Sequence, residues 1–242
     1  MIPRILLDTA PIPGSDKELR LYQHARDFSI DISGEGELMS SRVHGSEESL
    51  AELSCSRIAG RLHPRVLIGG LGMGFTLAAA LRHLGPGAEL VVAELVPKVV
   101  EWNRGPLGAE AGHPLLDSRV TVQEMDVAKI LKKEKQAFDA ILLDVDNGPN
   151  GLTHTGNNWL YSAAGLDASY SALKPRGILA VWSAGPDVRF SKRLRQSGFK
   201  VEEIQVHAHG KKGGKCLIWL AEPLHPSTVH RPPSIVHRPP YS

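Results

Sequence analysis

Three acidic residues lie at or just beyond the ends of apolar runs, where a side chain can act on a ligand. Glu94 lies at the end of AELVVAEL, Asp126 follows RVTVQEM, and Asp144 ends FDAILLD. Asp144 follows four apolar residues, and a carboxylate delivered to the end of a buried strand can accept a proton from a nucleophile. The alternative is that Asp144 holds a turn or caps a helix, as strand-end aspartates often do.

A glycine-rich segment precedes Glu94. VLIGG runs into Gly70-Leu-Gly72-Met-Gly74, and Glu94 lies 20 residues beyond Gly74. Glycines let the backbone turn tightly and approach a ligand, and a carboxylate at the end of the next strand can accept hydrogen bonds from both ribose hydroxyls. The loop, the spacing and the acid together predict that residues 66–146 form a Rossmann-like unit that binds an adenosine-containing molecule.

The glycine pattern also bears on which adenosine compound fits. A dinucleotide fingerprint reads GxGxxG, but Phe75 or Leu77 stands where the third glycine would be, so the pattern is GxGxG. This favours a nucleoside without a pyrophosphate and weakens a nicotinamide-dependent oxidoreductase. Asp126, after the third strand, can accept a hydrogen bond from an adenine amino group or cap the helix that follows it, and one residue can do both.

We interpret the ligand as a sulfonium donor of the S-adenosylmethionine type. Such a donor is already activated because its leaving group is a neutral thioether, so the protein needs mainly to align a nucleophile and exclude water. An amine nucleophile is protonated near neutral pH, and a carboxylate must then take its proton. Asp144 is the candidate for that role.

The elements that position these residues alternate between strand and helix. Apolar runs without polar alternation, separated by helical segments, indicate a parallel sheet covered on both faces. The chain is therefore expected to be an α/β protein with a seven-stranded, methyltransferase-type sheet that ends in an antiparallel hairpin. Strands are expected within 65–70, 88–95, 119–124, 138–145, 177–183, 199–208 and 215–223, and helices within 75–84, 97–104, 126–135, 159–173 and 186–198.

Both ends of the sequence differ from this middle part. Residues 1–44 carry short alternating runs split by Gly and Asp, which predict a small antiparallel β-hairpin layer. A helix over 44–60 follows, with Ser46 as its expected N-cap and Gly60 as its stop. We divide the chain into this layer (1–44), the catalytic domain (45–222) and a disordered Pro/His/Arg repeat tail (223–242), in which STVHRPP is followed by SIVHRPP.

Composition excludes several classes of function. The 28 Lys and Arg nearly balance the 26 Asp and Glu, so nothing argues for a nucleic acid or an anionic membrane as a partner. No run approaches the length of a membrane span, which favours a cytoplasmic protein. The 11 histidines and two cysteines show no spacing typical of a metal site, and no metal is expected.

The quoted motifs resemble those of the spermidine synthase family of polyamine aminopropyltransferases. The resemblance rests on VLIGGLGMGFTL, the junction of ELVVAEL with PKVVEWNR, the Met-Asp pair and FDAILLDVDNGP, and it covers roughly residues 17–205. It implies Asp144 as the base that deprotonates the attacking amine, and it implies a homodimer. It also implies that the cofactor is held by Gly70, Gly72, Met73, Gly74, Glu94, Asp126 and Val127.

The chain departs from the family where the amines bind. Met73 stands where the family's glycine loop usually has the aspartate that holds the aminopropyl ammonium of decarboxylated S-adenosylmethionine. Asn147 replaces the second acid of the DxxDP-like loop, with Asp146 one residue earlier. The Tyr–His/Gln pair that opens the family's gate helix falls on Ser46 and Glu47. Asp146, Asn147 and Glu47 are the candidate acceptor-binding residues.

The leading hypothesis is a transferase that alkylates a small-molecule amine. Its donor is decarboxylated S-adenosylmethionine, with methylthioadenosine as product, or S-adenosylmethionine itself. The alternative is a methyltransferase that releases S-adenosylhomocysteine. A non-catalytic nucleoside-binding protein and a nicotinamide-dependent oxidoreductase are the less favoured interpretations.

Overall fold

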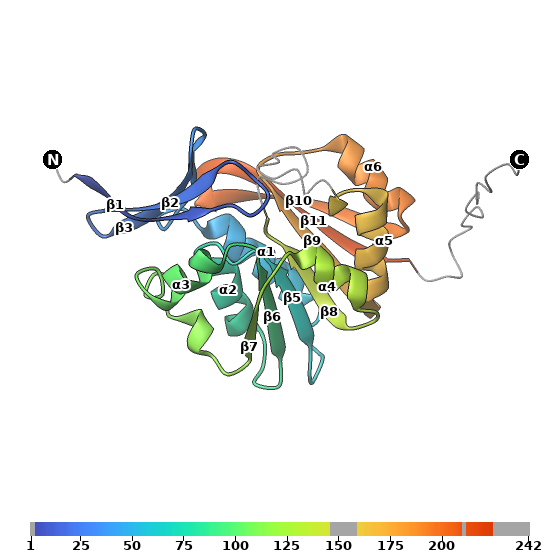
Figure 1. Cartoon of the computed structure of the whole chain (residues 1–242). Helices are drawn as coiled ribbons and strands as arrows, with labels where there is room; N and C mark the ends of the chain where they lie inside the picture. The colour runs from blue at the N-terminus through green and yellow to red at the C-terminus, as the bar shows by residue number, and fades with distance from the viewer. Residues whose placement is uncertain (1–2, 146–158, 210–211, 225–242) are drawn as a thin grey trace, which may run out of the picture.

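A seven-stranded mixed sheet forms the centre of the computed structural model, which describes residues 3–145, 159–209 and 212–224 (Figure 1). Five neighbouring strands are parallel, and the last two along the chain add antiparallel at one edge. The α/β fold expected from the sequence is confirmed. Across the sheet the strands are β10 (Phe199–His209), β11 (Lys212–Pro223), β9 (Leu173–Ser183), β8 (Phe138–Leu143), β5 (Arg65–Gly69), β6 (Glu89–Glu94) and β7 (Val120–Glu124).

Helices cover both faces of this sheet because alternate residues of each strand point to opposite sides. In β5, Val66 and Ile68 pack in one hydrophobic cluster, whereas Leu67 packs in the other. The first cluster contains α1 (Gly45–Ser56), α2 (Phe75–His83) and α3 (Pro97–Arg104), and the second contains α4 (Val127–Lys133), α5 (Ala163–Ala172) and α6 (Val188–Gln196). A short 3-10 helix, η1 (Pro114–Leu116), precedes β7.

A second, four-stranded antiparallel sheet lies beside the large one (Figure 1). Its strands in order are β1 (Arg4–Pro11), β2 (Glu18–His24), β3 (Asp27–Ile32) and β4 (Gly36–Ser40). Leu19, Leu21, Ile30 and Ile32 alternate along β2 and β3 and are buried in the cluster that also contains α1 to α3. The small sheet therefore shares a hydrophobic core with the large one.

The start and end of α1 differ from the sequence expectation. The helix begins at Gly45 with His44 as its N-cap, and it ends at Ser56, so Ser46 as the N-cap and Gly60 as the stop were wrong. The Ser46 hydroxyl lies inside the helix and donates a hydrogen bond to the Glu47 carboxylate at 2.6 Å. Arg57 closes the helix because its N–H reaches the carbonyls of the last turn.

Several expectations fall outside the described residues. Asp146, Asn147 and the repeat tail beyond Leu224 are among them, and the domain boundaries after 44 and 222 stay a prediction. Within the described ranges, none of the helices has the length and apolarity to cross a membrane, and no group of three His, Cys, Asp or Glu side chains is placed to hold a metal ion.

Candidate active site

The glycine loop after β5 packs directly against the backbone at the end of β8. Gly70 has a left-handed φ of +90°, and a Cβ there would lie 2.3 Å from the carbonyl oxygen of Asp144. Only glycine fits this approach, since any side chain would have to displace the neighbouring backbone. Gly72 also has a positive φ, and the Met39 sulfur lies 3.2 Å from where its Cβ would be. The loop therefore packs closely against the end of β8 and against Met39, and Gly70 and Gly72 also line a cavity.

Gly74, the third glycine of the loop, marks the start of α2. It is the left-handed N-cap of α2, and a Cβ on it would lie 3.0 Å from the Asn103 side-chain oxygen. The described cavities are lined by Gly70 and Gly72, whereas Gly74 turns the chain from the loop into the helix. Its assignment to the cofactor stays a prediction.

Glu94 braces the glycine loop from the end of β6. Its side chain is buried, and its two carboxylate oxygens accept hydrogen bonds from the backbone N–H groups of Leu71 and Val96, each at 2.8 Å. Burial raises the pKa of Glu94, and the N–H groups that its carboxylate accepts from oppose the rise. Glu94 also lines the first cavity, and its role as the acceptor for the ribose hydroxyls stays a prediction.

Asp126 caps α4. Its Oδ1 accepts from the Ala128 N–H at 2.8 Å, so the capping interpretation of this residue is confirmed. Asp126 also lines the cavity beside Met125 and Val127, where an adenine ring would meet it. The second role stays a prediction, and the geometry leaves the other carboxylate oxygen for it.

Asp144 follows β8 directly and is half-buried. The Thr76 hydroxyl, in the first turn of α2, donates to Asp144 Oδ2 at 2.5 Å. Burial, with the negative charge of Glu47 nearby, raises the pKa of Asp144 to about 7, although the hydrogen bond from Thr76 opposes the rise. A carboxylate with a pKa near neutrality is suited to exchange a proton with a substrate.

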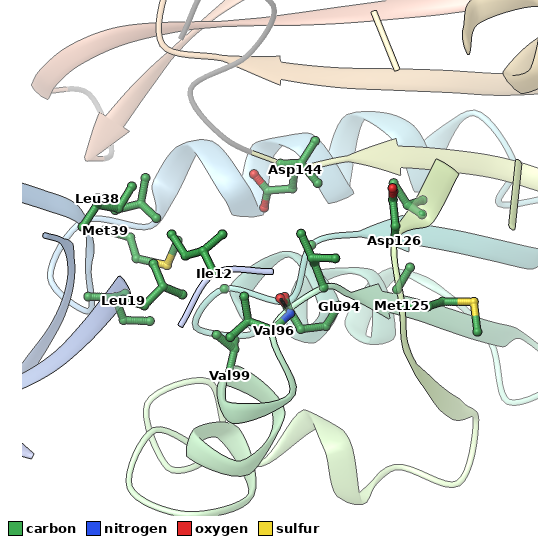
Figure 2. A pocket seen from close by; sticks show the side chains of 18 residues that line it. Ile12, Leu19, Leu38, Met39, Glu94, Val96, Val99, Met125, Asp126 and Asp144 are labelled. Carbon is green, nitrogen blue, oxygen red and sulfur yellow. Dashed lines mark hydrogen bonds between the residues drawn. The ribbon is translucent and has the colours of Figure 1, made fainter. Parts of the chain in front are cut away.

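Two adjoining cavities meet at Asp144. The first, shown in Figure 2, has Glu94, Asp126 and Asp144 on the side of the large sheet and apolar side chains of the small sheet facing them. The second reaches from Asp144 to Glu47, and burial raises the pKa of that carboxyl group as well. The first is lined in part by Ile12, Leu19, Ile30, Ile32, Leu38 and Met39, and the second by Leu38, Met39, Ser40, Glu47, Leu71, Gly72, Met73, Phe75, Thr76, Asp144 and Trp182.

A family model for the spermine/spermidine synthase domain matches residues 48–193. The chain belongs to this family. A curated polyamine aminopropyltransferase from Oceanobacillus iheyensis is 27% identical over 175 residues, which are 71% of this chain and 33% of the relative. The chain therefore spans about a third of the length of that relative.

Solved structures of spermidine synthases have the same fold. The enzyme from Thermotoga maritima gives a TM-score of 0.71 at 18% identity, covering 90% of this chain and 72% of that chain. A spermidine synthase in complex with the transition state analogue AdoDATO gives a TM-score of 0.70 at 18% identity, with the same coverage of both chains.

Met73 lies in the second cavity and is 3% exposed. Its assignment to the cofactor stays a prediction. Sequence analysis alone did not identify three features that line the two cavities: Thr76, Trp182 and the apolar face of the small sheet. Thr76 is the one polar residue in the apolar stretch FTLAAAL, and Trp182 lies near the end of an apolar strand, so both carried a signal. The residues that they contact in the fold lie far away in the sequence, and no local sequence pattern predicts those contacts.

Proposed function

We propose that the chain transfers an aminopropyl group from decarboxylated S-adenosylmethionine to an amine. The observation that carries the proposal is the position of Asp144, which lies where the two cavities meet and has a pKa raised to about 7. Membership of the spermine/spermidine synthase family supports the reaction class.

The residues of the first cavity suit the adenosine half of the donor. Gly70 and Gly72 line this cavity, Glu94 offers acceptors to the ribose, and Asp126 offers one to the adenine amino group. A spermidine synthase with the same fold forms a complex with the transition state analogue AdoDATO, which supports a transferase site in this fold. The apolar side chains of the small sheet exclude water from the reacting centre.

In the proposed reaction Asp144 takes the proton of the acceptor amine. The amine nitrogen then attacks the methylene carbon bonded to the sulfonium, the C–S bond breaks, and its electron pair stays on sulfur. The products are the alkylated amine and neutral methylthioadenosine. Thr76 orients the carboxylate that receives the proton, and the second cavity holds the acceptor.

Product analysis tests the reaction. The protein is incubated with an amine panel and either decarboxylated S-adenosylmethionine or S-adenosylmethionine, and mass spectrometry distinguishes an added aminopropyl group from an added methyl group. We expect aminopropyl products. Methyl transfer is the second candidate because Met73 leaves the glycine loop without an acid, and methylated products alone would overturn the first proposal.

Binding provides an independent test of the donor site. Glu94→Ala removes both the ribose acceptors and the brace of the glycine loop, so methylthioadenosine binding measured by calorimetry should fall at least a hundredfold. Glu89→Ala, an exposed substitution at the start of the same strand, is the control and should leave the affinity unchanged. Tight binding of NAD without binding of any thioadenosine would favour the oxidoreductase instead.

We also propose a cytoplasmic homodimer. Sedimentation of the purified protein and fractionation of cells that produce it would test the two parts of this proposal separately.

A further inference from the structure

Asn103 on α3 is a buried polar residue beside the glycine loop. It is 2% exposed and lies on the same helix as the buried apolar residues Val99, Val100 and Trp102. Its Nδ2 donates to the carbonyl oxygens of Gly72 and Val99, each at 2.8 Å. A buried amide without partners is costly, so these two hydrogen bonds fix where the side chain lies.

The Asn103 side chain meets the glycine loop on both sides of Met73. Because Gly72 and Val99 both offer carbonyl oxygens, the NH2 end of the amide must face them, and the amide oxygen must face another way. That oxygen, Oδ1, lies 3.0 Å from where a Cβ of Gly74 would be. One side chain therefore contacts the glycine that lines the cavities and the glycine that begins α2.

Glu94 and Asn103 hold the loop from two different elements. Glu94, at the end of β6, accepts from the Leu71 N–H at 2.8 Å, and Asn103 donates to the next carbonyl along the loop, that of Gly72. Burial raises the pKa of Glu94, and the Gly72 N–H is among the backbone groups that oppose this rise. The backbone of Gly72 therefore interacts with Glu94 through its N–H and with Asn103 through its carbonyl oxygen.

Gly72 needs this support because a glycine has few restraints of its own. Its φ is +52°, in the left-handed region, and a glycine populates both signs of φ readily. Fixing such a backbone around a ligand costs conformational entropy. Side chains that fix the loop before the ligand arrives reduce this cost and so strengthen binding.

We infer that Asn103 is a positioning residue for the nucleoside site, which acts through Gly72 and fixes the glycine loop in the form that the donor binds. Asn103 is not among the described residues that line the two cavities, so its effect on a ligand passes through the backbone that it holds. The inference rests on the proposed nucleoside donor and adds a residue of α3 to its binding site.

Asn103→Ser separates the two hydrogen bonds. A serine hydroxyl in a helix can bond to the carbonyl four residues earlier, here that of Val99, but it is shorter than the amide and should not reach Gly72. We expect the affinity for methylthioadenosine, measured by calorimetry, to fall at least tenfold because the Gly72 carbonyl loses its donor. At saturating donor and acceptor, kcat should change less than threefold, since the hydrogen bond between Thr76 and Asp144 does not involve α3.

Ser169→Ala is the matched control for a general loss of stability. Ser169 on α5 is also fully buried, and its hydroxyl donates to the Gly165 carbonyl four residues earlier at 3.0 Å. It lies in the helix layer on the other face of the large sheet, so its loss should lower the melting temperature and leave the affinity unchanged. An unchanged affinity in Asn103→Ser, or an equal loss of affinity in Ser169→Ala, would overturn the inference. If Asn103→Ser does not fold, Asn103→Thr keeps the hydroxyl, refills more of the space and is judged by the same outcomes.

A double substitution tests whether Asn103 and Glu94 act on the same loop. Glu94→Gln and Asn103→Ser are measured separately and together by titration with methylthioadenosine. We expect the combined loss of affinity to be smaller than the product of the two single losses, because the first substitution already releases the loop. Losses that multiply would show that the two residues act independently and would contradict a shared role.

Failure of the proposed reaction gives a different pattern. If the natural chain binds methylthioadenosine but forms no aminopropyl product, the reaction assignment is wrong, and the affinities of Asn103→Ser and Ser169→Ala still decide the role of Asn103. If the natural chain binds no methylthioadenosine, the donor site and the inference are both overturned.

Discussion

Asp144 is ionised only at a cost to the folded protein. Burial and Glu47 raise its pKa from 3.8 to about 7, so the folded chain keeps this proton over a pH range in which the unfolded chain releases it. A folded state that binds more protons loses stability as the pH rises through that range, here from about 4 to about 7. The property that suits Asp144 to receive a proton from a substrate therefore lowers stability at neutral and alkaline pH.

Asp144→Asn separates these two effects. We expect turnover to fall about 10²- to 10⁴-fold, the usual contribution of a general base, while methylthioadenosine still binds. The variant should also gain thermal stability relative to the natural chain at pH 8 but not at pH 4, where both side chains are neutral. Steady-state kinetics and thermal unfolding at the two pH values measure both effects, and full activity of the variant would show that another group is the base.

Thr76 sets the ionisation of Asp144 through one hydrogen bond. Its hydroxyl donates to Oδ2 and opposes the rise in the pKa of Asp144, so its loss should raise that pKa. We expect Thr76→Val to move the acidic limb of the pH–rate profile to higher pH, with little change in the KM for the donor. Thr76→Ser keeps the donor group and is the control. If the acidic limb of the pH–rate profile does not shift in Thr76→Val, Thr76 does not influence the ionisation of Asp144 and has only a packing role.

At the scale of elements, the junction of β5, β8 and α2 decides whether the site can form. Gly70→Ala would place a methyl group 2.3 Å from the Asp144 carbonyl oxygen at a φ of +90°. We expect the free energy of unfolding to fall by more than about 1 kcal/mol and nucleoside binding to be lost. Gly85→Ala is the matched control, since Gly85 is exposed and a Cβ on it meets nothing within 4 Å. Urea unfolding and calorimetry would measure both; a tolerated Gly70→Ala would mean that the loop can move away from β8.

The same elements show how far sequence reasoning reaches. β5, β6 and β8 were predictable because buried parallel strands are continuous apolar runs, and the acids at or just beyond their ends lie at one edge of the sheet by topology. β1 lies within the predicted β layer, but the exposure of Ile5, Leu6 and Leu7 on it could not be predicted, since an apolar run normally indicates burial. The partnership of Thr76 with Asp144 spans 68 residues, and that of Met39 with Gly72 spans two sheets. Such contacts follow from packing and leave no local pattern.

At the scale of the whole molecule, the small sheet has two roles. Its apolar side chains line the first cavity, and they are also part of the main hydrophobic core. Ile30 on β3 is 1% exposed and belongs to the cluster that contains α1 to α3, whereas Ile5 on β1 of the same sheet is 52% exposed. The small sheet and the large sheet should therefore unfold together and not as independent units.

This cooperativity is testable with matched substitutions in the small sheet. Ile30→Ala should lower the free energy of unfolding of the whole chain by about 2–5 kcal/mol, the usual loss for a buried isoleucine, and Ile5→Ala should lower it much less. Trp219 is fully buried in the cluster on the opposite face of the large sheet and reports on that region. Urea unfolding followed by the fluorescence of Trp219, with the other tryptophans replaced by Phe, should shift to lower urea in Ile30→Ala as far as the circular dichroism does. An unshifted Trp219 transition would show that the small sheet unfolds separately and that the first cavity can open without loss of the main core.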